Sequence, residues 1–390
     1  MIDFNTVYSR KGTYAAKWDG AEFVFGQPNL HPMWVADMDF PAPDTVVEAL
    51  RSRVDHKIFG YTLTPDSLIE AVCSWEMRRY QWKVEKEWIL FSPGVVTSIS
   101  AAIQALTEPG DKILMHTPIY PPFFEITEAA SREVVYSTLM DEEEQYQINW
   151  DEFENHLKSG VKIFLFCHPH NPSGRVWTRE ELQQIIQLCK KYDVTILSDE
   201  IHCDLTMPSY QHIPIALVDP SFQNKIVTFI SPTKTFNLAG LQASSMIVPD
   251  KNLREKIQTF QNLQGFHGLN LFGIVAMEAA YTKGEAWLDE PLIYLQENSQ
   301  TTRDFLANRL PKIKMKQHQA TYLLWLNCRE LGIDQETLLS ALLNDGKLAL
   351  ENGVKYGPSG EGYVRMNVAC PRSLLIEGLE RLDRALFKFN

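Results

Sequence analysis

The sequence predicts an α/β fold in which a mostly parallel sheet is covered by helices and joined to a smaller α+β domain. Two observations support this prediction. Through the middle of the chain, short apolar runs alternate with amphipathic helical segments, as in a parallel sheet with helices on both faces. Toward the C-terminus the pattern changes, because the strand-like runs 322–326 and 363–368 are each followed by an amphipathic helix, 335–344 and 373–387.

The strands of the large domain are predicted from apolar runs rich in β-branched residues. They are expected at residues 112–115, 163–167, 194–197, 226–230 and 244–248. Such continuous runs are typical of strands that are buried on both faces. We place the large domain at residues 46–285 and the small domain at residues 1–45 and 286–390.

The helices of the large domain are predicted from their start signals. Thr178 and Glu181 form a capping box ahead of apolar residues at helical spacing. Another helix is expected over residues 64–82, with Pro65 in its first helical position. These helices supply the layers that cover the predicted sheet.

Composition and charge exclude several classes of protein. The chain has 390 residues, of which 45% are hydrophobic and 22% are charged, so it can bury a large core. Its formal net charge of -12 argues against nucleic acid or an anionic membrane as a partner, because both attract basic surfaces. The N-terminus lacks the pattern of a secretory signal, and no apolar run approaches the length of a membrane span. We expect a soluble, cytoplasmic protein.

Neither the cysteines nor the histidines indicate a metal site. The six cysteines are scattered without a C-x-x-C pair, so we expect buried, reduced thiols. His168 and His170 could share one face as metal ligands, but no third ligand follows at a recognisable spacing, and we predict no metal. Asn171 lies in the same proline-rich turn, where a fixed backbone could aim its amide at a ligand oxygen.

Lys234 is the first candidate for a reactive group. It follows the predicted strand 226–230 in the turn 231–240, and a further apolar run comes after it. If this turn is buried, desolvation lowers the pKa of the lysine. The resulting amine can act as a nucleophile, a proton carrier and a Schiff-base partner. The alternative is a lysine in an ordinary surface turn.

Two further features lie at predicted strand and helix ends. Asp199 follows the run 194–197, where side chains face the ligand crevice of an open α/β sheet. A carboxylate buried there needs a cation, such as a protonated pyridine nitrogen, unless it only caps the following turn. Gly94 opens a helix predicted over residues 95–106, whose first amides could bind a phosphate.

Together these motifs resemble the fold-type I pyridoxal-phosphate enzymes, the aspartate aminotransferase superfamily. The motifs are the Asn-Pro-x-Gly turn at Asn171, the Ser-Asp-Glu strand end around Asp199 and the Ser-x-x-Lys segment that ends at Lys234. The resemblance spans nearly the whole chain. It implies an aspartate aminotransferase-like fold with a mostly parallel seven-stranded sheet, and pyridoxal 5′-phosphate as the cofactor.

The resemblance also implies a role for each matching residue. Lys234 forms the Schiff base with the cofactor and later acts as the base at the substrate Cα. Asp199 holds the protonated ring nitrogen and Asn171 bonds the ring hydroxyl. Tyr120 stacks on the ring and is counted with Lys234 among the catalytic residues. The resemblance further assigns to the cofactor Ser231, His202 and the amides of Val95 and Val96. It assigns to the substrate Ala36 and Arg365, of which Arg365 binds the substrate carboxylate. For His202, a purely structural role stays open.

Departures from the superfamily pattern narrow the resemblance. Many aminotransferases have a phosphate-binding arginine eight residues after the lysine, whereas this chain has Gln242. Together with the segments 33–40, 59–62 and 198–202, Gln242 resembles the MalY/PatB group of cystathionine β-lyases, also called C-S lyases. In that group the tyrosine matching Tyr61 reaches the phosphate of the neighbouring subunit, so the resemblance implies a homodimer.

The activity implied by this group is α,β-elimination from L-cystathionine or related L-cysteine S-conjugates, which gives pyruvate, ammonia and a thiol. Pro121 follows Tyr120 where some members carry a second tyrosine, so no role is carried over to position 121. Two alternatives stay open. One is an aminotransferase for hydrophobic or aromatic amino acids, and the other is a non-catalytic regulatory protein on the same fold.

Overall fold

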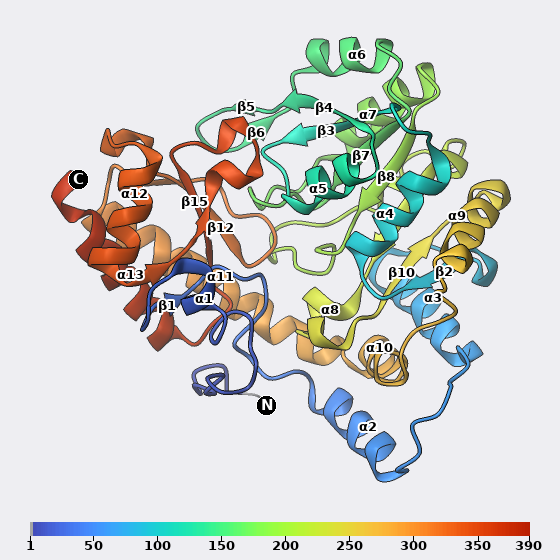
Figure 1. The fold of residues 1–390 in the computed structure, drawn as a ribbon, viewed down its shortest axis with the longest axis horizontal. Helices are drawn as coiled ribbons and strands as arrows, with labels where there is room; N and C mark the ends of the chain where they lie inside the picture. Colours follow the sequence, from blue (N-terminus) through green and yellow to red (C-terminus); the bar gives the residue numbers. More distant parts are fainter. Residues whose placement is uncertain (1–2) are drawn as a thin grey trace.

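The largest feature of the computed structural model, which describes residues 3–390, is a seven-stranded sheet (Figure 1). From edge to edge its strands are β2 (Ile89–Ser92), β10 (Ser244–Ile247), β9 (Ile226–Ile230), β8 (Thr195–Asp199), β7 (Ile163–Cys167), β3 (Lys112–Thr117) and β4 (Glu133–Thr138). Strand β10 runs antiparallel to both of its neighbours, and the remaining pairs are parallel. The predicted mostly parallel seven-stranded sheet is confirmed.

The central strands match the predicted apolar runs, and the edge strands do not. Strands β7 and β9 have the predicted bounds, and every residue in them is buried. The two edge strands, β2 and β4, lie outside the five predicted runs. Strand β4 carries three exposed residues in six, because only one of its sides has a neighbouring strand and its faces are incompletely covered. A continuous apolar run therefore identified the core of the sheet but not its margins.

Helices cover both faces of this sheet. One layer contains α4 (Val95–Leu106), α5 (Pro122–Ala129) and α9 (Lys251–Leu263). The other contains α3 (Asp66–Tyr80), α6 (Trp150–Lys158), α7 (Arg179–Lys191) and α10 (Leu271–Lys283). Successive strand residues face alternate layers: Leu165 packs with the first, and Phe164 and Phe166 pack with the second.

The helix-start signals were confirmed in one case and wrong by one residue in another. Helix α7 begins with the predicted capping box, in which Glu181 N–H donates to Thr178 Oγ1 at 3.3 Å and Thr178 N–H donates to Glu181 Oε2 at 2.9 Å. Helix α3 begins at Asp66, so Pro65 is its N-cap, with an extended backbone, and not its first helical residue.

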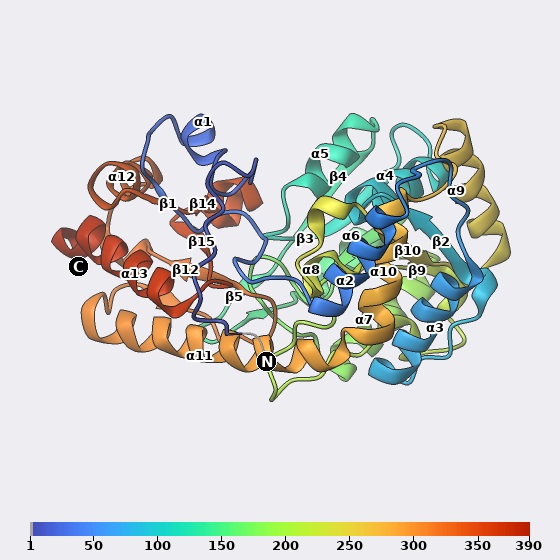
Figure 2. The same ribbon diagram turned by 90° about the horizontal axis from the view of Figure 1, so that it is seen from below.

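A second lobe contains the smaller sheet, and α11 (Glu285–Arg309) runs along both lobes (Figure 2). The sheet is antiparallel, in the order β11 (Lys314–Met315), β12 (Leu323–Asn327), β15 (Tyr363–Asn367) and β14 (Glu351–Asn352). Helices α12 (Gln335–Ala341) and α13 (Arg372–Leu386) pack against it in a separate apolar core. The strands and helices predicted for the C-terminal region are present, whereas the exact domain boundaries stay a prediction.

The remaining elements connect or flank these two sheets. They are α1 (Ala21–Phe25), α2 (Asp44–Asp55), the single-turn helix α8 (Pro232–Thr235), the parallel pair β1 (His31–Pro32) and β13 (Leu348–Ala349), and the antiparallel pair β5 (Met140–Asp141) and β6 (Tyr146–Gln147). All six cysteines are free, and five are buried as predicted; Cys73 is half-buried. Within residues 3–390, no helix combines the length and apolar character needed to cross a membrane.

Candidate active site

The carboxyl ends of neighbouring parallel strands bring the predicted site residues to one edge of the large sheet. In the strand register Cys167 lies beside Asp199, and Asp199 lies beside Phe229. The turn after β7, the end of β8 and the turn after β9 therefore meet. Because these segments carry Asn171, Asp199 and Lys234, the three residues lie at the crevice where an open α/β sheet binds ligands.

Lys234 lies on α8 and is half-buried, so the surface-turn alternative is wrong. Its Nζ donates a hydrogen bond to the Ala36 carbonyl oxygen at 2.6 Å. The pKa of Lys234 is lowered from 10.5 to about 8, mainly by burial and also by the Arg365 charge, while Asp37 and Asp199 oppose the shift. Roughly a tenth of an amine with this pKa is unprotonated at pH 7, far more than of an ordinary lysine, and a nucleophile or base requires this form.

The buried side chain of Asp204 fixes the position of α8. Thr235, the residue after Lys234, donates its hydroxyl to Asp204 Oδ2 at 2.8 Å. The other oxygen of Asp204 accepts from Tyr80 OH at 2.5 Å and from Trp75 Nε1 at 3.2 Å. These contacts fix the backbone beside the lysine, and the sequence reasoning did not include them.

Asp199 is a buried carboxylate whose charge is not matched by a cation in direct contact. Its side chain is 5% exposed, and Oδ1 accepts the Ile201 N–H at 3.1 Å. No partner of Oδ2 is found in the described part of the chain. Burial raises the pKa of Asp199 from 3.8 to about 7, and the neighbouring Glu200 adds to the shift. One oxygen thus caps the following turn, as the alternative reading expected, and the other is left for a cationic ligand.

Arg365 reaches the site from β15 of the smaller sheet. It is 3% exposed, and its Nη1 donates to Asn171 Oδ1 at 3.2 Å while Nη2 donates to the Trp34 carbonyl at 2.9 Å. Its Nε is buried and lacks a partner within residues 3–390. An arginine with an unused buried donor beside a reactive lysine suits a carboxylate ligand.

Tyr120 and His202 border the same crevice. Tyr120 follows β3 and is half-buried, with its ring edge-on to Phe123 at 5.8 Å; burial raises its phenol pKa. His202 is 3% exposed, and its Nδ1 has no partner in the part of the chain that the structure describes. Burial, together with the charges of Lys234 and Arg365, lowers the pKa of His202 to about 3. The ring is therefore neutral.

The amino end of α4 provides backbone donors at the predicted phosphate position. The N-cap Gly94 is extended, and no side chain caps this helix. The amides of Val95 and Val96 belong to the first turn, which has no acceptors within the helix. The Ser231 hydroxyl, in contrast, contacts Ala243 O at 2.7 Å and accepts the Thr233 N–H at 3.1 Å as the N-cap of α8. Its predicted contact with phosphate would have to replace one of these bonds.

The remaining residues considered from the sequence are two exposed side chains and two histidines that have partners of their own. Tyr61 is fully exposed and lies outside the cluster within one chain, and Gln242 is exposed with a left-handed backbone. His168 Nε2 bonds Ile213 O at 3.1 Å, and His170 Nδ1 bonds Ser173 Oγ at 2.7 Å. Among the described residues, no group of three or more His, Cys, Asp or Glu is placed to hold a metal ion. A wide groove of about 900 Å³ along α11 and residues 311–318 contains none of the predicted site residues.

Ala36 and Tyr322 have a role that the sequence reasoning did not find. Ala36 was assigned to the substrate pocket, and the structure shows that its carbonyl oxygen is the acceptor for Lys234. The same oxygen accepts from Tyr322 OH at 2.9 Å, and Tyr322 is fully buried. A backbone carbonyl leaves no signature in the sequence, so this contact could be found only from coordinates.

The fold and the strand-end cluster define the family of class I and II aminotransferases, and the chain belongs to it: the family's sequence profile matches residues 34–382. Within this family the chain is similar to cystathionine beta-lyase PatB of Bacillus subtilis, at 44% identity over 386 residues, covering 99% of this chain and 100% of that protein. Protein MalY of Escherichia coli is 32% identical over 99% of both chains. The crystal structure of cystalysin from Treponema denticola, which contains pyridoxal 5′-phosphate, has a TM-score of 0.97 and 32% identity over 100% of both chains. The predicted resemblance is confirmed.

Proposed function

We propose that this protein is a pyridoxal-phosphate-dependent C-S β-lyase that acts on L-cystathionine or a related S-conjugate of L-cysteine. The products are pyruvate, ammonia and a thiol. The observation that carries this proposal is the 44% identity, over essentially the full length of both chains, to a protein named cystathionine beta-lyase. The site geometry supports it, because the chemistry needs a buried amine, a carboxylate and a carboxylate-binding arginine in one crevice.

The residues of the crevice fit pyridoxal 5′-phosphate. Asp199 has a carboxylate oxygen without a partner in the described chain, which suits the protonated ring nitrogen. The uncapped first turn of α4 suits the phosphate, with Val95, Val96 and Ser231 as its proposed ligands. Asn171 is proposed for the ring hydroxyl, and Tyr120 and His202 for the ring's surroundings. When bound, the cofactor supplies the electron sink for the pair released when the substrate Cα–H bond breaks.

The side chains of the crevice divide the remaining tasks. Lys234, with a pKa of about 8, is the group that takes the proton from the substrate Cα and carries it. Arg365 binds the substrate carboxylate through its unused donor, and this fixes the orientation of Cα. Neutral His202 adds no positive charge that would lower the proton affinity of Lys234 further. The thiolate of the substrate side chain leaves from Cβ, so a good leaving group favours elimination over transamination.

We further propose that the active unit is a cytoplasmic homodimer in which Tyr61 of the partner subunit completes each site. Four apolar residues of one short segment are exposed in the single chain: Ile58, Phe59, Tyr61 and Leu63. Exposed apolar segments of this kind mark association surfaces. Six free cysteines are consistent with a reducing compartment.

Incubation of the purified protein and cofactor with L-cystathionine tests the function. Pyruvate is expected from the wild type and not from Lys234→Ala, while Lys225→Ala, which alters a lysine that is 41% exposed, retains activity. Conversion of other amino acids only when a 2-oxo acid is present, without pyruvate from L-cystathionine, would identify an aminotransferase instead. A visible cofactor band that is identical in Lys234→Ala would contradict the role of this lysine.

A further inference from the structure

The loop of residues 33–40, between β1 and α2, sets the position of the Lys234 amine. Its Ala36 carbonyl oxygen accepts hydrogen bonds from Lys234 Nζ at 2.6 Å and from Tyr322 OH at 2.9 Å. Any shift of this backbone moves the acceptor that holds the amine. What fixes the loop therefore also fixes Lys234.

Side chains from two distant segments hold the backbone of this loop. Arg365 and Asn367 of β15, and Asn237, which follows α8, each donate hydrogen bonds to it over 2.6–2.9 Å. The carbonyl oxygens that accept these bonds lie on both sides of Ala36: Trp34, Val35, Asp37 and Met38. The loop is thus tied to both lobes of the molecule.

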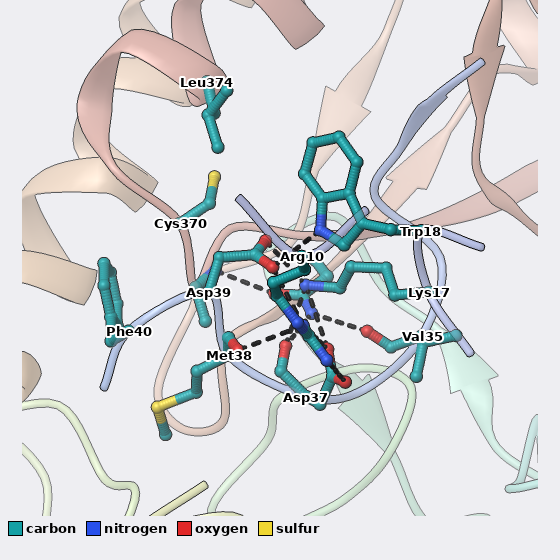
Figure 3. Close-up of polar contacts among 12 residues, drawn as sticks. Arg10, Lys17, Trp18, Val35, Asp37, Met38, Asp39, Phe40, Cys370 and Leu374 are labelled. Atoms are coloured by element: carbon teal, nitrogen blue, oxygen red, sulfur yellow. Dashed lines mark hydrogen bonds and ion pairs between the residues drawn. The ribbon is translucent and has the colours of Figure 1, made fainter. Parts of the chain in front are cut away.

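A four-charge cluster of Arg10, Lys17, Asp37 and Asp39 ties the same loop to the N-terminal segment (Figure 3). Arg10 contacts Asp37 at 2.6 Å and Asp39 at 2.9 Å. Lys17 contacts Asp39 at 2.9 Å and Asp37 at 3.1 Å. Trp18 Nε1 adds a hydrogen bond to Asp39 Oδ1 at 2.9 Å. The two cations balance the two carboxylates, so the cluster is formally neutral.

The four-charge cluster lies largely out of water. The side chains of Lys17 and Asp39 are 1% and 5% exposed, and those of Asp37 and Arg10 are 14% and 24% exposed. Arg10, Asp37 and Asp39 border a cavity of about 320 Å³. Burial alone would raise the pKa of Asp37, but its contacts with Arg10 and Lys17 lower it below the ordinary value, so Asp37 is ionised. Because water screens buried charges poorly, a change of charge here acts on neighbouring groups.

Lys234 is one of those neighbours. Burial is the main cause of its lowered pKa, and four charged groups on four segments modify it: Asp37, Asp199, Arg365 and Lys17. The two aspartates raise the pKa of Lys234 and the two cations lower it. Tyr322 also faces the amine through their shared acceptor, and burial raises its pKa, which keeps the phenol neutral.

We propose that Asp37 and Lys17 are positioning residues for Lys234: with Arg10 and Asp39 they hold the loop that carries Ala36, and their opposite charges set how readily the amine gives up its proton. This inference rests on the proposed function, which uses Lys234 as the proton carrier. It extends the active site to the segment of Arg10 and Lys17, which pair with the loop 33–40 and not with Lys234 itself.

The test measures the pKa of Lys234 in the full-length protein after the cofactor is released with hydroxylamine, which breaks its Schiff base with Lys234, and removed by dialysis. Acetic anhydride reacts with unprotonated amines, so the acetylation rate of Lys234 across pH, followed by mass spectrometry of its peptide, reports this pKa. Asp37→Asn gives the cluster a net positive charge and is expected to lower the pKa. Lys17→Met gives it a net negative charge and is expected to raise the pKa. Each shift should be about half a unit or more.

The sign of the Asp37→Asn shift separates a charge effect from simple loosening of the loop. A loosened loop exposes the amine and raises its pKa toward 10.5 in both variants. The double variant Asp37→Asn/Lys17→Met is neutral again and should return the pKa toward the wild-type value. Lys11→Met, which alters an exposed lysine of the same segment, is the control and should leave it unchanged. Shifts of the same sign in both single variants, or no shift in Asp37→Asn, overturn the proposal.

A replacement variant and a readout that is independent of activity make the test decisive. If Lys17→Met does not fold, Arg10→Gln changes the charge of the cluster in the same sense at a side chain that is 24% exposed, and it should raise the pKa of Lys234 as well. Labelling needs no substrate, so it is independent of the lyase assay. Shifted labelling without pyruvate formation would refute the proposed function alone, and pyruvate formation with unshifted labelling would refute the positioning role alone.

Discussion

Arg365 Nη1 donates a hydrogen bond to Asn171 Oδ1 over 3.2 Å, and this contact joins the smaller sheet to the turn that follows β7 of the larger sheet. Both residues are almost fully buried. The proposed substrate-binding residue is therefore positioned by the proposed cofactor-binding residue. A substrate carboxylate bound by Arg365 would therefore be held at a fixed position relative to the cofactor, although the two ligands are bound by different lobes.

Arg365→Lys is expected to lower kcat/KM for L-cystathionine by roughly 10- to 100-fold, which corresponds to the loss of one or two charge-assisted hydrogen bonds. A lysine keeps the charge but cannot contact Asn171, Trp34 and a carboxylate with one planar group. Steady-state kinetics should show mainly a higher KM. Arg329→Lys, at a side chain that is 45% exposed, serves as the control. Unchanged KM in Arg365→Lys would exclude Arg365 as the carboxylate ligand.

Asp199→Asn is expected to stabilise the cofactor-free protein at pH 8. The pKa of Asp199 is about 7 in the folded chain and 3.8 in an exposed aspartate. Between these values the folded chain keeps a proton that the unfolded chain has released, so the free energy of unfolding falls as the pH rises from about 4 to about 7. Above pH 7 the charged group costs roughly 4 kcal/mol, a penalty that asparagine avoids.

Thermal unfolding of both cofactor-free proteins at pH 8 and pH 5 checks this prediction. The variant should have the higher Tm at pH 8, and the difference should shrink at pH 5. Addition of pyridoxal 5′-phosphate should stabilise the wild type more than the variant, because only the wild type gains a partner for its buried charge. Equal stabilisation of both proteins would argue against the contact between Asp199 and the ring nitrogen.

The sequence predicted that three of the proposed site residues follow recognisable strands. Asp199 and Lys234 each come directly after an apolar run, and in parallel strands such ends must meet at one edge of the sheet. Asn171 lies in a turn rich in proline and glycine, whose position after β7 was equally clear. For these residues local patterns gave the position after each strand, the geometry of a parallel sheet supplies the long-range arrangement, and the proposed roles came from the family resemblance.

The supporting contacts could not be predicted because they join segments without a common pattern. Two aspartates in the apolar segment 33–40 indicate that buried carboxylates need cations there. Nothing in their spacing points to Arg10 and Lys17, which precede them by 20 residues or more in the ion pairs observed. The Ala36 carbonyl is still less accessible to sequence reasoning, because every residue has one.

Glu200→Gln is expected to change the free energy of unfolding by less than about 1 kcal/mol, whereas Glu200→Leu should cost about 3 kcal/mol or more. Glu200 and His212 are buried and lie 2.7 Å apart, and Glu200 also accepts the Ser198 hydroxyl at 2.8 Å. Burial raises the pKa of Glu200 to about 7 and lowers that of His212 to about 3. A neutral amide can replace the carboxyl group, but leucine leaves the Ser198 hydroxyl, the His212 ring and the Ile215 N–H without this partner.

Urea unfolding of the two variants beside the wild type measures these differences. The comparison controls for side-chain volume, because both replacements are close in size to glutamate. If Glu200→Gln proved as costly as Glu200→Leu, the pair would have to be charged in the folded protein, contrary to the directions of its pKa shifts. Activity of Glu200→Gln should stay near that of the wild type, since Asp199 and not Glu200 faces the crevice.

Mixing inactive subunits tests whether Tyr61 acts in the site of its partner. Tyr61 is fully exposed in the single chain, and it lies outside the cluster formed by Asp199, Lys234 and Arg365. If Tyr61 crosses the interface, a hybrid of Tyr61→Ala and Lys234→Ala subunits has one intact site and one doubly defective site. Random reassociation makes about half of the dimers hybrids, so activity should recover to about a quarter of the wild-type value.

Pyruvate release from L-cystathionine before and after the subunits are allowed to exchange measures this recovery. Asp199→Asn mixed with Lys234→Ala is the matched control, because both residues belong to the same chain's site and each hybrid site keeps one defect. No recovery should occur in that mixture. If Tyr61 acts within its own chain, Tyr61→Ala mixed with Lys234→Ala also fails to recover, and the shared site is refuted. Since sedimentation reports dimer formation separately, a mixture that does not assemble cannot be mistaken for this result.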